Sequence, residues 1–257
     1  MNNVISFCLY GTGNKYLHGI IESVISYKLF FDDSWEIRVY ICKSLYTHRV
    51  VKILKNLNVK VIIRKQMSTK PDSNELMYSR FQPIFEKDVR YFLSRDADSR
   101  CTLREKKMVD DFMKSKKTLH TILDSGCHHG IMGGMFGVYV KNIEKYDIQH
   151  FSEFIDPIIK KEGMTRRGSD QTWLRNVFKD VVDKKDVFVH FNEDIIIRNK
   201  QRGIELNDIK LMNDIKVVEC SHSITQHVSN FVGRQINVDH VPNDVKARSQ
   251  VFLPIVF

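Results

Sequence analysis

Residues 89–100 read Val-Arg-Tyr-Phe-Leu-Ser-Arg-Asp-Ala-Asp-Ser-Arg, an apolar run that ends in two aspartates one residue apart. The run from Val89 to Leu93 is typical of a buried β-strand. Ligands of α/β proteins bind beyond the carboxyl ends of strands, and Asp96 and Asp98 directly follow this strand. Paired carboxylates suit Mg²⁺ or Mn²⁺, ions that proteins commonly share with substrate phosphates. The stretch therefore predicts a strand that presents a metal site at the edge of a sheet.

The specificity of this motif is low when it is taken alone, since acidic pairs are also common in solvated loops. Arg95 and Arg100 flank the aspartates. Guanidinium groups match the geometry of phosphate oxygens, so these arginines favour a ligand that carries phosphate.

The segments around this stretch alternate between strand and helix patterns. Val4 to Tyr10 is typical of a buried strand, and apolar residues at helical spacing follow a glycine turn as far as Ile25. Further strands are predicted at 35–42, 59–63, 118–123 and 186–190, and helices at 46–57, 78–83, 103–113 and from Ser169 onward. Alternating units of this kind form parallel sheets with right-handed crossovers. We expect an α/β fold, a Rossmann-type single domain whose mostly parallel central sheet is flanked by helices.

The composition is that of an ordinary globular protein. The chain has 257 residues, of which 42% are hydrophobic and 28% charged, and its formal net charge is +9. A positive balance suits nucleic acid, an anionic surface or phosphorylated substrates. The lysines are spread along the chain without the interleaved aromatic residues of a strand-binding groove, so a basic nucleic-acid-binding protein is only an alternative. We expect a core at 1–195 and a C-terminal extension at 196–257 that packs on it.

The cysteine pattern and the apolar runs bear on the compartment. The five cysteines are odd in number and scattered, and none forms a Cys-x-x-Cys pair, so reduced thiols are expected. The N-terminal residues lack the pattern of a signal peptide, and no run approaches the roughly eighteen apolar residues of a membrane span. These features predict a soluble cytoplasmic protein, in the host cytoplasm if it is viral.

Three short motifs together resemble a known family. Asp96-Ala97-Asp98, with Arg80-Phe81 upstream and Gly133-Gly134-Met135-Phe136-Gly137 downstream, resembles the Asp-x-Asp signature of GT-A glycosyltransferases. The similarity is closest to small viral and bacterial sugar transferases with an Arg-Asp-Ala-Asp-Ser-Arg segment followed by Gly-Gly-Met-Trp-Gly. It covers residues 4–180 and is most specific over 78–137, with Phe136 in place of the expected tryptophan.

The resemblance implies a GT-A-like fold and a metal-dependent hexosyl- or pentosyltransferase. The donor would be a nucleotide sugar, a UDP- or GDP-sugar, and the acceptor a hydroxyl of a glycan or glycoconjugate. Mn²⁺ or Mg²⁺ would lie on Asp96 and Asp98, with His190 completing the metal sphere. The donor would be held by these aspartates and by residues around the motif, with Tyr10 and Gly11 flanking the base: Tyr10, Gly11, Arg80, Arg95, Ala97, Gly133 and Gly134.

A second landmark is Asp170-Gln171, which follows Ser169 at a predicted helix start. An acid is favourable at any helix start, so the pattern alone is common. The resemblance implies that Asp170 lies in the active site with Gln171 near it, and that Asp124 is the alternative carboxylate. If Asp170 is the base opposite the leaving group, configuration inverts; if the pair lies beneath the sugar ring, retention is expected. The sequence leaves both outcomes open.

The sequence also contains patterns of two other chemistries. Cys127-His128-His129 invites a zinc site, but adjacent side chains rarely bind one ion in tetrahedral geometry and no fourth ligand is evident. A phosphatase of the haloacid dehalogenase type also places Asp-x-Asp after an apolar strand. Its motif usually carries Thr or Val where this chain has Arg100, and here the motif follows three predicted strands. The phosphatase is therefore an alternative to the transferase.

Overall fold

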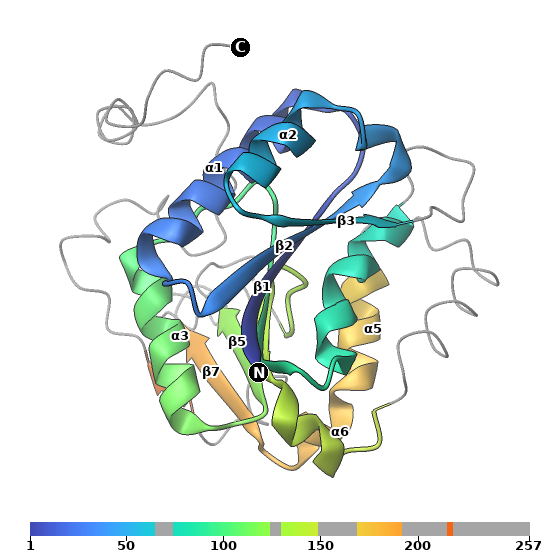
Figure 1. The fold of residues 1–257 in the computed structure, drawn as a ribbon. Helices are drawn as coiled ribbons and strands as arrows, with labels where there is room; N and C mark the ends of the chain where they lie inside the picture. Colours follow the sequence, from blue (N-terminus) through green and yellow to red (C-terminus); the bar gives the residue numbers. More distant parts are fainter. Residues whose placement is uncertain (65–73, 124–129, 149–168, 192–214, 218–257) are drawn as a thin grey trace, which may run out of the picture.

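A computed structural model of the chain describes residues 1–64, 74–123, 130–148, 169–191 and 215–217, and its strands form one eight-stranded sheet (Figure 1). The sheet order is β3-β2-β1-β4-β6-β5-β7-β8. The strands are β1 (Asn2–Leu9), β2 (Trp35–Cys42), β3 (Lys60–Arg64), β4 (Val89–Arg95), β5 (Leu119–Leu123), β6 (Met135–Tyr139), β7 (Val187–Phe191) and β8 (Ile215–Val217). β6 runs antiparallel to β4 and β5, and the other neighbours are parallel.

Helices cover both faces of this sheet (Figure 1). The α-helices are α1 (Asn14–Phe30), α2 (Arg49–Asn56), α3 (Leu103–Ser115), α5 (Ser169–Val177) and α6 (Lys179–Asp183). The 3-10 helices are η1 (Lys43–Leu45), η2 (Asn74–Phe85) and η3 (Val140–Lys145). No helix in the described ranges combines the length and apolar character needed to cross a membrane.

The expected α/β class, with a mostly parallel sheet between helices, is confirmed. The predicted strand at 35–42 coincides with β2, and the other predicted strands and helices differ from the observed ones by a few residues at their ends. β6 was not predicted, because its segment was interpreted as a glycine-rich approach to a ligand. Residues 192–214 and 218–257 lie outside the described part, so the boundary at 195 stays a prediction.

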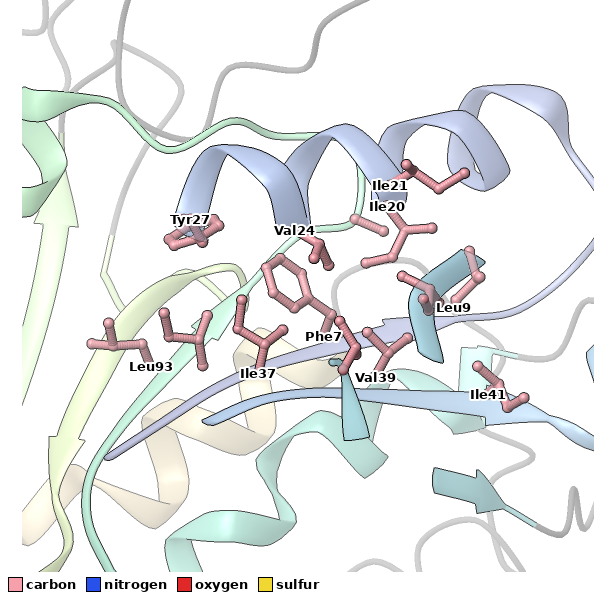
Figure 2. Packing of buried hydrophobic residues seen from close by; sticks show 14 of the residues in the cluster. Phe7, Leu9, Ile20, Ile21, Val24, Tyr27, Ile37, Val39, Ile41 and Leu93 are labelled. Atoms are coloured by element: carbon pink, nitrogen blue, oxygen red, sulfur yellow. The ribbon is translucent and has the colours of Figure 1, made fainter. Parts of the chain in front are cut away.

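One half of the core lies under α1, α2 and α3. Strand side chains alternate between the two faces of a sheet, and every second residue of β1 and β2 meets α1 in this way. Figure 2 shows Phe7, Leu9, Ile37, Val39, Ile41 and Leu93 of the sheet against Ile20, Ile21, Val24 and Tyr27 of α1. This packing holds α1 beside the carboxyl ends of β1 and β4.

The other half of the core is an aromatic cluster under η2 and α5. The rings of Phe81 and Trp173 stack with centroids 5.6 Å apart, and Phe81 contacts Phe136 edge-on at 5.4 Å. All three side chains are fully or almost fully buried. Phe136, which stands where the family pattern has tryptophan, therefore contributes its ring to this cluster from β6. Aromatic packing of this kind fixes η2 and α5 beside each other.

Two histidines form a buried pair beneath α3. His120 of β5 stacks on Phe112, and its Nε2 lies 2.9 Å from Nδ1 of His190 on β7. His190 Nε2 lies 3.9 Å from a carboxylate oxygen of Asp111. Burial, then His190 and then Arg95 lower the pKa of His120 well below its ordinary value of 6.5. His120 is therefore neutral in the folded protein.

This pair predicts a loss of stability in acid. The unfolded chain takes up a proton on His120 below about pH 6.5, whereas the folded chain does not. Lowering the pH from about 7.5 to about 5.5 should then cost on the order of 1 kcal/mol of unfolding free energy through this residue. Urea denaturation of the wild type and of His120→Gln measures the difference, because the variant should lose that part of the pH dependence. His48→Asn, at an exposed cap of α2, is the control. Equal pH dependence in wild type and His120→Gln would contradict the assignment.

Candidate active site

The side chain of Arg80 connects the Asp-x-Asp motif to the start of α5. Arg80 belongs to η2 and is 4% exposed. Its Nη1 donates to Asp96 Oδ1 at 2.5 Å, and its Nη2 donates to Asp170 Oδ2 at 3.1 Å. Asp96 directly follows β4, and Asp170 lies in the first turn of α5 and is 4% exposed. One buried cation thus joins two carboxylates from segments that are distant in sequence.

Gly133 and Gly134 lie directly against these carboxylates. A Cβ at Gly134 would overlap the carboxylate of Asp96, and a Cβ at Gly133 would overlap Asp170 Oδ2 and lie 2.7 Å from Arg80 Nη2. Ser94 Oγ donates to the Gly133 carbonyl at 2.6 Å and fixes this segment against β4. The two glycines were expected to admit the donor. In the structure they admit the chain's own carboxylates, and contact with a donor stays a prediction.

Cys8 and Tyr10, at the end of β1, lie close enough to the cluster of Arg80, Asp96 and Asp170 to feel its charges. Burial raises the pKa of the Cys8 thiol to about 11; Arg80 opposes this shift, and Asp96 and Asp170 add to it. Burial, and after it the neighbouring Cys8, raises the pKa of the Tyr10 phenol. The thiol is therefore protonated at neutral pH and is not an activated nucleophile. The protonated phenol of Tyr10 can donate a hydrogen bond.

Gly11 follows Tyr10 at the turn into α1. Its φ of 74° lies in the left-handed region, where glycine is favoured. The turn therefore needs glycine for its own backbone. The predicted role of Gly11 beside a nucleotide base stays a prediction.

The second aspartate of the motif is paired with α1. Asp98 is 3% exposed at its side chain, and its Oδ2 lies 2.8 Å from Nζ of Lys15. The turn that carries it is docked on the same helix, because Ser23 Oγ donates to the carbonyl of Ala97 at 3.1 Å. At Gly19, a Cβ would lie 2.7 Å from that carbonyl oxygen and 3.1 Å from Asp98 Cα. Ala97 thus contributes its backbone to the docking of the turn on α1.

Arg95 does not reach this cluster, in contrast to the expectation that it meets donor phosphate. It is 1% exposed, and its Nε donates to Glu105 Oε1 at 2.5 Å. Its Nη1 donates to the carbonyl oxygens of Ser94 and Phe136. Arg95 is enclosed between the sheet and α3 with its charge balanced by Glu105, so a phosphate does not have access to it.

His190 is also separate from the Asp-x-Asp motif. Its ring lies beneath α3 with those of His120 and Phe188. Within the part of the chain that the structure describes, no three His, Cys, Asp or Glu side chains are grouped to hold a metal ion. Asp96, Asp98 and His190 therefore do not form such a group, and His190 is not placed as their third metal ligand.

Of the remaining predicted site residues, some lie in the part of the chain that the structure describes and others do not. Gln171 follows Asp170 on α5 and is partly buried. Asp124 and the Cys127-His128-His129 segment lie outside the described residues. Sequence reasoning missed Lys15, Gly19 and Cys8, although each has a signal. Lys15 and Gly19 belong to the helix that follows the first strand, and Cys8 alternates with Ser6 on the face of β1 opposite Phe7.

A hollow of about 570 Å³ lies beside α2 and is lined by none of these residues. Its walls include Tyr46, His48, Arg49, Lys52 and Lys55. These exposed basic side chains fit the generic basic surface expected from the composition. The Arg80 cluster and not this hollow carries the chemistry considered below.

Comparison with known proteins gives structural similarity only. No family model and no curated protein sequence matches the chain. Among solved structures, the glycosyltransferase GlyE of Streptococcus pneumoniae is 13% identical, with a TM-score of 0.44, over 88% of this chain and 57% of that chain. TarS 1-349 of S. aureus in complex with UDP is 11% identical, with a TM-score of 0.43, over 71% of this chain and 65% of that chain.

Enzymes of another class are equally similar in structure. A cytidylyltransferase from Leptospira borgpetersenii is 13% identical, with a TM-score of 0.43, over 80% of this chain and 96% of that chain. The chain spans about half the length of several of the glycosyltransferase structures that it matches, namely 50%, 57% and 46%. One architecture hosts many activities. At these identities and TM-scores, we base the function on the residues of the site.

The first prediction from the site concerns the Arg80–Asp170 pair. Arg80→Met leaves the carboxylates of Asp96 and Asp170 without their shared cation and should cost about 2–4 kcal/mol of unfolding free energy. Asp170→Asn should cost about 1–3 kcal/mol. The double variant should lose less than the sum, with a coupling energy of about 1–3 kcal/mol. Urea denaturation of the four proteins measures this cycle, and additive losses would show that the two residues do not interact.

The second prediction concerns Gly134. The methyl group of Gly134→Ala cannot coexist with the observed carboxylate of Asp96, so the variant should lose about 1–3 kcal/mol of stability through overpacking. Gly13→Ala is the control without overpacking, because its Cβ would lie 3.7 Å from the nearest atom; as the N-cap of α1, it should lose only the capping preference of glycine over alanine. Thermal and urea unfolding of both variants should separate them clearly. Equal effects at the two positions would mean that Asp96 does not lie against Gly134.

Proposed function

We propose that this protein is a metal-dependent glycosyltransferase, which moves a sugar from a nucleotide-sugar donor to a hydroxyl of a glycan or glycoconjugate. The observation that carries the proposal is the junction of Asp96 and Asp170 on Arg80. It lies where β1 and β4 end, the edge at which α/β proteins bind ligands. It also unites both stretches of sequence that resemble GT-A enzymes, the Asp-x-Asp motif and the Asp-Gln helix start.

The motif fits a divalent ion in its donor chemistry. Mg²⁺ in enzymes is commonly bound by one or two carboxylates, with water and substrate phosphates as the other ligands. Asp96, whose side chain is 41% exposed, and Asp98 are donors of this type. A site of this kind needs no third protein ligand, so the position of His190 is compatible with it. When bound, the ion would neutralise charge that develops on the departing nucleoside diphosphate.

The chain's own residues supply the remaining functions. Arg80 holds Asp96 and Asp170 in a fixed relation, so that a sugar bound beside this junction would meet both carboxylates. Asp170 is a buried carboxylate whose Oδ2 is already bound to Arg80, which leaves its other oxygen as the proton acceptor for a hydroxyl. Tyr10, at the end of β1, presents an aromatic ring and a hydroxyl donor beside the same cluster. These positions suit the base and ribose of a nucleotide.

The stereochemistry of transfer follows from the position of the second carboxylate. If Asp170 takes the acceptor proton from the side opposite the leaving group, the product is inverted. If Asp170 and Gln171 lie beneath the sugar ring, the product is retained. Asp124 is the alternative base. The donor is a UDP- or GDP-sugar, and the sugar is a hexose or a pentose.

The test is turnover of nucleotide sugars with and without Mn²⁺. Thermal-shift screening first selects the donor, because a ligand that binds the native state raises the melting temperature. Asp96→Asn and Asp170→Asn should each reduce turnover of that donor by about a hundredfold or more, since each removes a group acting in the transition state. Asp33→Asn, at an exposed position, should retain full activity. Both variants lose a partner of Arg80 and should melt at a lower temperature, so turnover is measured well below the melting temperature of each to separate lost chemistry from lost folding.

Other results would identify a different enzyme. Hydrolysis of an aryl phosphate that depends on Asp96 would indicate the phosphatase. Release of pyrophosphate from a nucleoside triphosphate and a sugar phosphate would indicate a nucleotidyltransferase. Undiminished sugar transfer in both variants would refute the assignment of the site.

A further inference from the structure

Each aspartate of the motif is paired with a different cation of the chain. Asp96 is paired with Arg80, and Asp98 is paired with Lys15 at 2.8 Å. The two cations differ in mobility. Arg80 is buried and holds a second carboxylate, whereas the side chain of Lys15 is 31% exposed and has four flexible methylenes. Of the two, Lys15 is the one that can exchange its partner.

The backbone around Asp98 prevents the aspartate itself from withdrawing. Gly19 allows α1 to approach within contact distance of Asp98 Cα, and Ser23 binds the carbonyl of Ala97. Ser99 N also donates to the Asp96 carbonyl at 3.3 Å, which closes the turn. The backbone of Asp98 is therefore held against α1, and its carboxylate is 3% exposed, so the longer and more exposed side chain of Lys15 is the partner with more freedom to move.

A divalent ion and an ammonium group cannot share one carboxylate without strong repulsion, since like charges about 4 Å apart interact unfavourably. An ion that binds Asp98 must displace Lys15, and the displaced ammonium is then able to bind an anionic group of the ligand. Lys15 lies in the first turn of α1, and its Nζ is 5.2 Å from the centre of the Tyr16 ring. It follows the end of β1 by only a short turn, so it lies on the edge of the sheet where the donor's phosphates are proposed.

We infer that Lys15 is an exchange cation. Without donor it neutralises Asp98; with donor it binds the diphosphate, and the ion takes its place on Asp98. This inference rests on the proposed function and adds that the binding of the metal and the binding of the donor are coupled. Metal and nucleoside diphosphate bind cooperatively, because the diphosphate draws Lys15 away from Asp98 and the metal frees Lys15 to bind the diphosphate. Lys15 is thus a positioning residue that keeps the metal site closed until the donor arrives.

The test measures Mn²⁺ affinity by the electron paramagnetic resonance of free Mn²⁺, which requires no turnover. Wild type should bind Mn²⁺ weakly alone and more tightly with UDP or GDP, whichever raises the melting temperature. Lys15→Met should bind Mn²⁺ alone about three- to tenfold more tightly, the range expected for loss of a partly exposed competing pair. It should also lose most of the gain that the nucleotide gives. Lys15→Arg should retain the wild-type pattern in part, because it keeps the charge.

The controls separate this inference from the function on which it rests. Lys28→Met, on the exposed side of the same helix, should leave both affinities unchanged. Asp98→Asn should weaken Mn²⁺ binding in every background. If Mn²⁺ binding depends on Asp98 but is the same in wild type and Lys15→Met, the exchange role is refuted and the metal site stands. If Mn²⁺ binds none of the proteins, or binds Asp98→Asn as well as wild type, the metal assignment and the exchange role are both refuted.

Discussion

The buried guanidinium of Arg80 is the constraint on which the candidate site depends. A charge inside a protein is tolerated only when opposite charges and hydrogen bonds surround it, and removing one partner commonly costs several kcal/mol. Asp96 and Asp170 are those partners, and they come from the end of β4 and the start of α5. The fold must therefore bring η2, β4 and α5 to one point. The stacked Phe81 and Trp173, each adjacent to or near one member of the cluster, make that approach favourable through burial of aromatic surface.

Two cations near the motif have different physical roles. Arg95 is paired with Glu105, and Tyr27 donates to the same carboxylate oxygen at 2.6 Å, so this network joins the sheet to α1 and α3 from within the core. Arg80 stands at the border of the core, where Asp96 is still 41% exposed. The partners decide the difference, because both guanidinium groups are buried. The partner of Arg95 is the buried Glu105, whereas one of the two partners of Arg80 is the exposed carboxylate of Asp96, which a ligand can reach.

The strands and most helices could be predicted because apolar periodicity depends only on local spacing. The role of Arg95 could not be predicted from the motif alone, yet strand alternation contains the signal: Tyr91, Leu93 and Arg95 share one face of β4, and the first two are core residues. β6 contains the strand-forming residues Phe136, Val138 and Tyr139, but it was missed because the glycines in this segment favoured an approach to a ligand over a strand. Asp170 was placed near the motif through the family resemblance. Its link to Arg80 depends on long-range packing, which local spacing does not encode, and the same holds for Lys15.

The direction of β6 has a consequence for how the site is built. Parallel strands all finish at one rim, so their contributions to that rim come from residues that leave the sheet. β6 is inserted in the opposite sense, with Met135 beside Arg95, and so it enters the sheet at the rim where β4 ends. The segment just before β6, Gly133-Gly134, therefore lies at the same edge of the sheet as Asp96 and Asp170. If β6 were parallel to β4, the glycine pair before it would lie at the opposite edge of the sheet. Residues with side chains would then occupy the space beside Asp96 and Asp170 that the glycines leave open.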